Sequence, residues 1–143
     1  HQAVACIERI AGVNGAHAPR VDRIPGAIFC VPQVASVGLT ERAARAAGHE
    51  LRVGRFPFAA NGRAVAAGIG DGFVKTVFDA RSGELLGAHM VGEGVTELIH
   101  GFSLARTLEA TVEDLMQAVF PHPTLSESMH EAVLAAYGRA LHV

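Results

Sequence analysis

Residues 73–91, FVKTVFDARSGELLGAHMV, carry the clearest structural signal in this chain of 143 residues. Two apolar segments rich in Val, Phe and Leu flank the short polar sequence DARSG. β-Branched and aromatic residues favour strands, whereas Asp, Ser and Gly favour tight turns. We therefore predict two antiparallel strands joined by a hairpin turn.

Further strands are expected on the N-terminal side of this hairpin. Residues 27–30 and 34–38 are short β-like runs interrupted by Pro32, and residues 51–58 alternate apolar and polar side chains. Between them, residues 40–48 read as a helix that Thr40 caps and Gly48 ends.

The C-terminal third is expected to be helical. One helix runs from residue 95 to about Thr107, and a short one, capped by Thr111, runs through Ala118. FPHP then interrupts the pattern, because proline lacks an N–H and restricts the residue before it. Thr124 opens a last helix that ends near Gly138. The inward side chains of this last helix are Leu125, Met129 and Val133. Those of the helix from residue 95 to about Thr107 are Val95, Leu98, Phe102 and Ala105. Strands followed by helices predict an α+β fold with a mostly antiparallel sheet covered by helices.

The N-terminal part differs in composition. Residues 2–11 form a short amphipathic pattern, followed by a Gly- and Pro-containing stretch that reads as a linker. We place a boundary here, with a helix and linker at 1–23 and one main domain at 24–143. The initial helix is expected to belong with a segment upstream.

Composition excludes several classes of function. Twelve Lys and Arg against fourteen Asp and Glu give a net charge of −2, which argues against nucleic-acid binding. No apolar run reaches the roughly 20 residues that a bilayer requires. Half of the residues are hydrophobic and 18% are charged, so some apolar surface is expected to face another protein. Cys6 and Cys30 fit neither a CxxC pair nor a metal site, and we expect them to be buried thiols in a cytoplasmic protein.

Two candidate cofactor sites are weak. Residues 92–97, GEGVTE, follow a strand and precede a helix, but Glu97 replaces the third glycine of a dinucleotide fingerprint and would repel a pyrophosphate. His122, Glu127 and His130 are the nearest set of metal ligands, but they lack a metal-site spacing, so we predict no metal. Five other histidines are expected to be structural or solvated: His1, His17, His89, His100 and His142.

Residues 120–127, FPHPTLSE, leave two interpretations open. Thr124 and Glu127 have the spacing of a capping box, which would make His122 an exposed loop residue. Alternatively, the two prolines restrict the aim of His122, and Glu127 orients its ring and strengthens it as a general base. Ser126 lacks the G-x-S-x-G context of a hydrolase nucleophile.

Several stretches resemble, in the same order, one known domain. They are PQVASVGLTE at 32–41, VGRFPFAANGRA at 53–64, GFVKTVFD at 72–79, LLGAHMVG at 85–92, TELIHGF at 96–102 and HPTLSE at 122–127. Together they resemble the C-terminal dimerisation, or interface, domain of the pyridine nucleotide–disulfide oxidoreductase family, and most closely of its dihydrolipoamide dehydrogenases. Residues 1–12 resemble the helix that joins the flavin domain to this domain.

The resemblance implies a homodimer whose active sites are shared between subunits. One subunit would contribute FAD and a redox-active C-x4-C pair, and the other His122 as acid/base and Glu127 as the residue that orients it. It also implies a cis bond before Pro123, and the backbone of His122 and Pro123 against the partner's flavin. In the full-length enzyme, which uses FAD and NAD, the reaction would be NAD-linked oxidation of dihydrolipoamide for a 2-oxo acid dehydrogenase complex.

This chain carries neither a GxGxxG motif nor a C-x4-C pair. We therefore expect it to be inactive alone and to bind neither FAD nor NAD. Two alternatives remain open. The chain could come from another flavin disulfide reductase with a different disulfide or metal-ion substrate, or it could be a purely structural dimerisation module.

Overall fold

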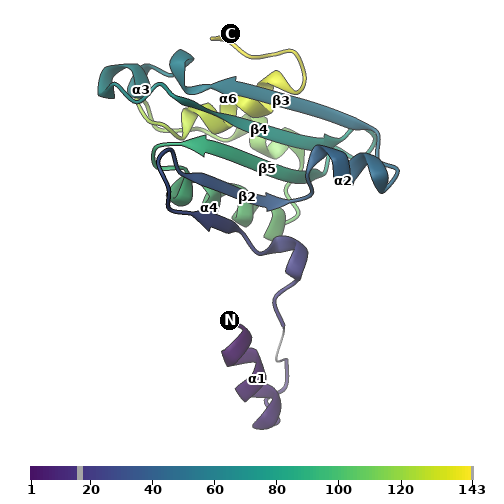
Figure 1. Ribbon diagram of the computed structural model, residues 1–143. Helices are drawn as coiled ribbons and strands as arrows, with labels where there is room; N and C mark the ends of the chain where they lie inside the picture. The colour runs from purple at the N-terminus through teal and green to yellow at the C-terminus, as the bar shows by residue number, and fades with distance from the viewer. Residues whose placement is uncertain (16–17, 143) are drawn as a thin grey trace.

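A five-stranded antiparallel sheet forms the centre of the computed structural model, which describes residues 1–15 and 18–142 (Figure 1). The strands are β1 (Gly26–Ile28), β2 (Val34–Gly38), β3 (Leu51–Pro57), β4 (Gly72–Asp79) and β5 (Leu85–Gly92). Their order is β1-β2-β5-β4-β3, and every neighbouring pair is antiparallel. The expected α+β class and the expected strands are confirmed.

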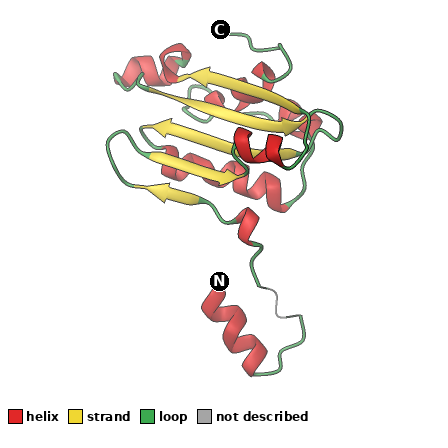
Figure 2. Cartoon of the chain, turned by 45° about the vertical axis from the view of Figure 1, so that its right-hand side comes forward, coloured by secondary structure: helices red, strands yellow, loops and turns green. Residues whose placement is uncertain are grey.

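Six α-helices and two 3₁₀ turns accompany the sheet in the described part of the chain. The helices are α1 (Gln2–Ile10), α2 (Glu41–Ala46), α3 (Gly62–Ala67), α4 (Val95–Thr107), α5 (Val112–Gln117) and α6 (Glu127–Ala135). The 3₁₀ turns are η1 (Val21–Arg23) and η2 (Phe58–Ala60). Helices α4 and α6 lie across one face of the sheet, and α2 lies on the other (Figures 1 and 2).

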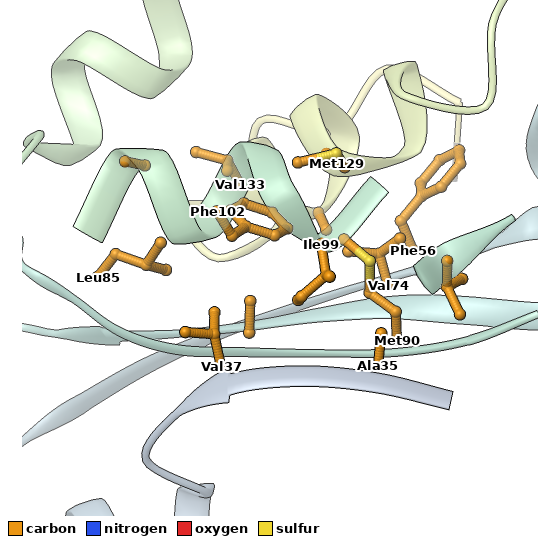
Figure 3. Close-up of a cluster of buried hydrophobic side chains, with 14 of the residues drawn as sticks. Ala35, Val37, Phe56, Val74, Leu85, Met90, Ile99, Phe102, Met129 and Val133 are labelled. Atoms are coloured by element: carbon orange, nitrogen blue, oxygen red, sulfur yellow. The ribbon is translucent and has the colours of Figure 1, made fainter. Parts of the chain in front are cut away.

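The predicted hairpin is β4–β5, which lies in the middle of the sheet. Register pairs Val74 with Met90 and Thr76 with Ala88, so side chains of both strands point to the same helical layer. Figure 3 shows Val74 and Met90 on the side of the sheet that faces Ile99 and Phe102 of α4 and Met129 of α6. The fully buried members of this core include Phe56, Phe58, Val74, Phe78, Met90, Val95, Phe102 and Val133. Burial of this apolar surface is the main force that holds the helices on the sheet.

Helix α6 approaches β3 closely because Gly54 has no side chain. A Cβ at Gly54 would lie only 1.9 Å from the carbonyl oxygen of Ala132 in α6. The Thr76 hydroxyl on β4 donates to the same Ala132 carbonyl at 3.0 Å. These two contacts fix α6, whose first residue is Glu127, against the sheet.

The linker before the sheet is also attached to the helical layer. Arg23 in η1 donates to the Thr107 carbonyl at 3.1 Å and forms an ion pair with Glu109 at 2.6 Å. By contrast, the apolar side chains Val4, Ile7 and Ile10 of α1 are 58%, 64% and 77% exposed. None of the helices within the described residues combines the length and apolar character needed to cross a membrane.

The structure corrects two expectations and adds one helix that was not expected. Cys6 and Cys30 are exposed rather than buried, because one lies on α1 and the other in the loop after the edge strand β1. The last helix begins at Glu127 rather than at Thr124, with Ser126 as its N-cap. Helix α3 was not predicted, although the Asn61 side chain caps it by accepting the Ala64 N–H at 2.9 Å.

The turn between β4 and β5 depends on the carboxylate of Asp79. Its Oδ1 accepts the backbone N–H groups of Arg81 at 2.8 Å and Ser82 at 2.9 Å, and its Oδ2 lies 2.6 Å from Nδ1 of His49. The hydrogen bond from Ser82, followed by those from His49 and Arg81, holds the pKa of Asp79 well below its usual range.

We predict that Asp79→Asn reduces the fall in the free energy of unfolding between neutral and acid pH, the acid limb of the plot of stability against pH. A carboxyl group whose pKa is lower in the folded than in the unfolded chain stabilises the fold above its ordinary pKa of about 4, and this stabilisation is lost as the pH falls below that value. Urea unfolding at a series of pH values from about 7 to 2 measures the effect. Asp71→Asn, at an exposed residue before β4, is the matched control. An unchanged acid limb in Asp79→Asn would contradict this role.

Candidate functional site

The sequence HPTLSE forms a compact loop between α5 and α6. Helix α5 ends at Gln117, and α6 begins at Glu127, so the loop enters α6 directly. The peptide bond between His122 and Pro123 is cis, as the resemblance implies. The loop therefore projects His122 beside the N-terminus of a helix that is fixed to the sheet.

The carboxylate of Glu127 holds the loop through both of its oxygens. Oε1 accepts Nδ1–H of His122 at 2.9 Å, and Oε2 accepts the backbone N–H of Thr124 at 2.8 Å. Both predicted contacts are therefore present. The same carboxylate accepts the Thr124 N–H, as in a capping box, and pairs with the ring of His122.

Only half of the expected capping box is present. The Thr124 hydroxyl donates to the Pro121 carbonyl at 2.7 Å instead of accepting an N–H from the first turn of α6. Because that hydroxyl has a single proton, the hydroxyl of Ser126, 2.7 Å away, must donate to it. Ser126 is therefore engaged within the loop, and its geometry does not favour a nucleophilic role.

The electrostatics of Glu127 suit an orienting role. The backbone N–H of Thr124 is the largest influence that lowers its pKa, and the ring of His122 lowers it further against the opposing effect of desolvation. Glu127 is thus ionised near neutral pH and acts as an acceptor. With Nδ1 of His122 bound to it, Nε2 is the ring nitrogen left to exchange a proton.

His122 and Glu127 differ strongly in accessibility. The side chain of His122 is 80% exposed, whereas that of Glu127 is 30% exposed. An oriented imidazole on the surface can enter a site formed with another surface, while its partner carboxylate stays anchored. This arrangement can move a proton to or from a group that docks against the loop.

His130 supports the loop and does not join the pair. Its ring stacks on Phe120 with centroids 5.1 Å apart, and its Nε2 lies 3.0 Å from the carbonyl oxygen of Met116. His130 thereby ties the end of α5 to α6. The set His122, Glu127 and His130 does not converge, and the described residues contain no cluster of three potential ligands for a metal ion.

The other histidines have separate environments. His89 contacts the Leu39 carbonyl at 3.0 Å, and His100 is exposed on α4. His142 lies 2.8 Å from Glu131, a pair that the sequence did not indicate. His1 is exposed before α1, and His17 lies outside the described residues.

The glycines of GEGVTE serve the turn into α4. Gly94 precedes that helix with a φ of 72°, a conformation that glycine adopts without strain. The segment is therefore a strand-to-helix turn, as the missing third glycine favours.

Sequence reasoning missed the role of Asn61 in this site. The Asn61 amide Nδ2 donates to the carbonyl oxygen of Thr124 at 3.0 Å, across a sequence separation of 63 residues. Asn before a short Ala-rich segment is a recognisable N-cap signal and could have predicted α3. Its second contact depends on tertiary structure and has no local signal.

Comparison with known proteins places these features in a family. The model of the pyridine nucleotide-disulphide oxidoreductase dimerisation domain matches residues 24–133. The chain is 61% identical over 142 residues to a dihydrolipoyl dehydrogenase of Zymomonas mobilis and 45% identical over 142 residues to one of Bacillus subtilis. It is covered over 99% of its length in both comparisons but spans only 30% of each relative.

Solved structures agree with the sequence relatives. LpdA from Mycobacterium tuberculosis superposes with a TM-score of 0.82 and 27% identity, covering 90% of this chain and 28% of that one. The HOCl-induced flavoprotein disulfide reductase RclA from Escherichia coli gives 0.77 and 27%, covering 87% and 30%. The family model matches residues 24–133, and a relative that is 61% identical covers 99% of the chain. The chain therefore belongs to the pyridine nucleotide-disulphide oxidoreductase dimerisation domain family.

Proposed function

We propose that this chain is the dimerisation domain of a dihydrolipoamide dehydrogenase and that it supplies an acid/base pair to the partner subunit. The observation that carries the proposal is the contact of 2.9 Å between Nδ1 of His122 and Oε1 of Glu127. It leaves an exposed imidazole with a defined orientation on a family dimerisation domain.

The chemistry requires a base at this place. A dithiol is mostly protonated near neutral pH, while only a thiolate attacks a disulfide. Nε2 of His122 takes the proton of one substrate thiol, and the resulting thiolate attacks one sulfur of the partner's disulfide. The second substrate thiol, deprotonated in its turn, then attacks the first substrate sulfur and displaces the enzyme sulfur bound to it. The substrate leaves as a disulfide, and both electrons remain on the enzyme's thiols. The imidazolium, stabilised by Glu127, returns its proton to a leaving thiolate.

The proposal assigns the cofactors to the full-length enzyme. FAD would accept the electrons from the thiols and pass them to NAD. The residues present suit the edge of such a site, since the His122 side chain is 80% exposed and Glu127 holds its ring from one side. We place residues 1–23 with the flavin domain, which is supported by the exposed apolar side chains of α1. The lipoyl groups of a 2-oxo acid dehydrogenase complex are the proposed source of the dithiol.

A second candidate is another flavin disulfide reductase with the same domain. The superposition on RclA supports it, because that protein is a disulfide reductase with a related fold. The two candidates differ in substrate, so the ratio of kcat/KM for dihydrolipoamide to that for other dithiols distinguishes them. A purely structural module is a third candidate, in which His122 has no chemical role.

We predict that His122→Gln in the full-length enzyme slows flavin reduction by dihydrolipoamide by about 10²–10⁴-fold, the usual contribution of a general base. Rapid mixing followed at the flavin absorption band measures this step. His100→Gln, at an exposed site on α4, is the matched control and should keep the normal rate. A normal rate in His122→Gln would exclude the acid/base role.

Glu127→Gln separates the orienting role from a capping role. Glutamine retains an oxygen for the Thr124 N–H but loses the charge that stabilises the imidazolium of His122. We expect the rate of dithiol-driven flavin reduction to fall by about tenfold or more, with the thermal midpoint nearly unchanged. A lowered midpoint with an unaltered rate would instead support the structural module.

A further inference from the structure

The side chain of Asn61 connects two parts of the fold that are far apart in the sequence. It is only 4% exposed, and both ends of its amide are used. Oδ1 accepts the N–H of Ala64 at 2.9 Å, which caps α3, and Nδ2 donates to the Thr124 carbonyl at 3.0 Å. An amide with two such partners has its O and N positions determined by the network.

Asn61 is itself held rigidly. Its backbone N–H donates to the Phe58 carbonyl at 2.9 Å, and its own carbonyl accepts the N–H of Val65 at 3.0 Å. Phe58 and Ala64 on either side are fully buried in the core. The amide therefore projects from a fixed point between η2 and α3.

Thr124, the residue to which Asn61 bonds, donates two further hydrogen bonds within the loop. The N–H of Thr124 donates to Glu127, and its hydroxyl donates to Pro121. Its carbonyl, which receives the Asn61 amide, lies before the first turn of α6. Asn61 thus fixes the peptide plane between the cis bond at Pro123 and the carboxylate that binds His122.

We propose that Asn61 is a positioning residue for the His122–Glu127 pair. This inference rests on the proposed function, because the pair has to be chemically active for its position to matter. The Asn61 side chain bonds to Thr124 and Ala64 and not to His122 itself. It acts by holding Thr124, whose N–H is the second anchor of the Glu127 carboxylate. A loss of this hold would let the loop move and leave His122 poorly aimed.

A role in capping α3 alone is the competing explanation, and one substitution separates the two. Asn61→Asp keeps an oxygen that caps α3, since aspartate is as good an N-cap as asparagine. It removes the donor and places a carboxylate against the Thr124 carbonyl, where two acceptors repel each other. The cap is retained, and only the link to the loop is lost.

The experiment compares three variants of the full-length enzyme: Asn61→Asp, His122→Gln and Thr40→Ala. Thr40→Ala is the capping control, because Thr40 caps α2 by accepting the Ala43 N–H, far from the loop in sequence. Flavin reduction is measured with dihydrolipoamide and, separately, with NADH across a range of pH, together with thermal unfolding.

We expect Asn61→Asp to reduce kcat for dihydrolipoamide by about tenfold or more and to shift its pH profile, with a smaller effect on KM. Flavin reduction by NADH should stay normal, because it needs no proton transfer at His122. The thermal midpoint should fall, because a buried carboxylate then faces the Thr124 carbonyl. Thr40→Ala should lower the midpoint without slowing dithiol oxidation.

Three results would overturn the inference. A normal dithiol rate in Asn61→Asp beside a slow His122→Gln would reject Asn61 as a positioning residue and leave the proposed function intact. An equal loss in the dithiol and NADH reactions, with a lowered midpoint, would indicate a general structural role. A normal rate in His122→Gln would reject the proposed function and this inference with it.

Discussion

The carboxylate of Glu127 is the contact on which the geometry of the HPTLSE loop depends. One oxygen binds the ring of His122 and the other binds the backbone of Thr124, at 2.9 and 2.8 Å. Because both bonds start from one rigid group, the imidazole and the loop backbone are placed relative to each other. Charge-assisted hydrogen bonds are stronger than neutral ones, so this bond can hold the largely exposed ring of His122 in one orientation.

The sheet and its helices give that carboxylate a fixed position. Gly54 and Thr76 hold α6 on β3 and β4, and Glu127 is the first residue of that helix. Asn61, which lies between η2 and α3, bonds to the loop at Thr124, and His130 ties α5 to α6. The β4–β5 hairpin and its core do not contact His122, but they support the elements that limit the movement of its loop.

Much of the fold could be predicted because its signals are local. The hairpin at residues 73–91 combines β-branched strands with a turn closed by Asp79, and Thr40 and Thr111 are N-caps of ordinary type. The pairing of His122 with Glu127 was only one of two interpretations of a spacing. The spacing alone could not show that the Glu127 carboxylate makes both contacts, one to His122 and one to Thr124. Whether it can do so depends on the path of the loop backbone.

The features that were missed depend on tertiary contacts. Exposure of Cys6 and Cys30 follows from the peripheral positions of α1 and the loop after β1, whereas the expectation of burial came from the average behaviour of cysteine. Asn61 carries a local capping signal, but its bond to Thr124 spans 63 residues. Helix α6 begins at Glu127 and not at the predicted Thr124, because the Thr124 hydroxyl bonds to the Pro121 carbonyl and does not cap the helix.

The tautomer of His122 tests the central claim most directly. Long-range ¹H–¹⁵N spectra of the protein labelled at histidine nitrogens report which ring nitrogen carries the proton. The account predicts that neutral His122 is protonated at Nδ1, which is bonded to Glu127, and that Glu127→Gln weakens this preference. A neutral ring protonated at Nε2, or a tautomer mixture that Glu127→Gln does not change, would contradict it.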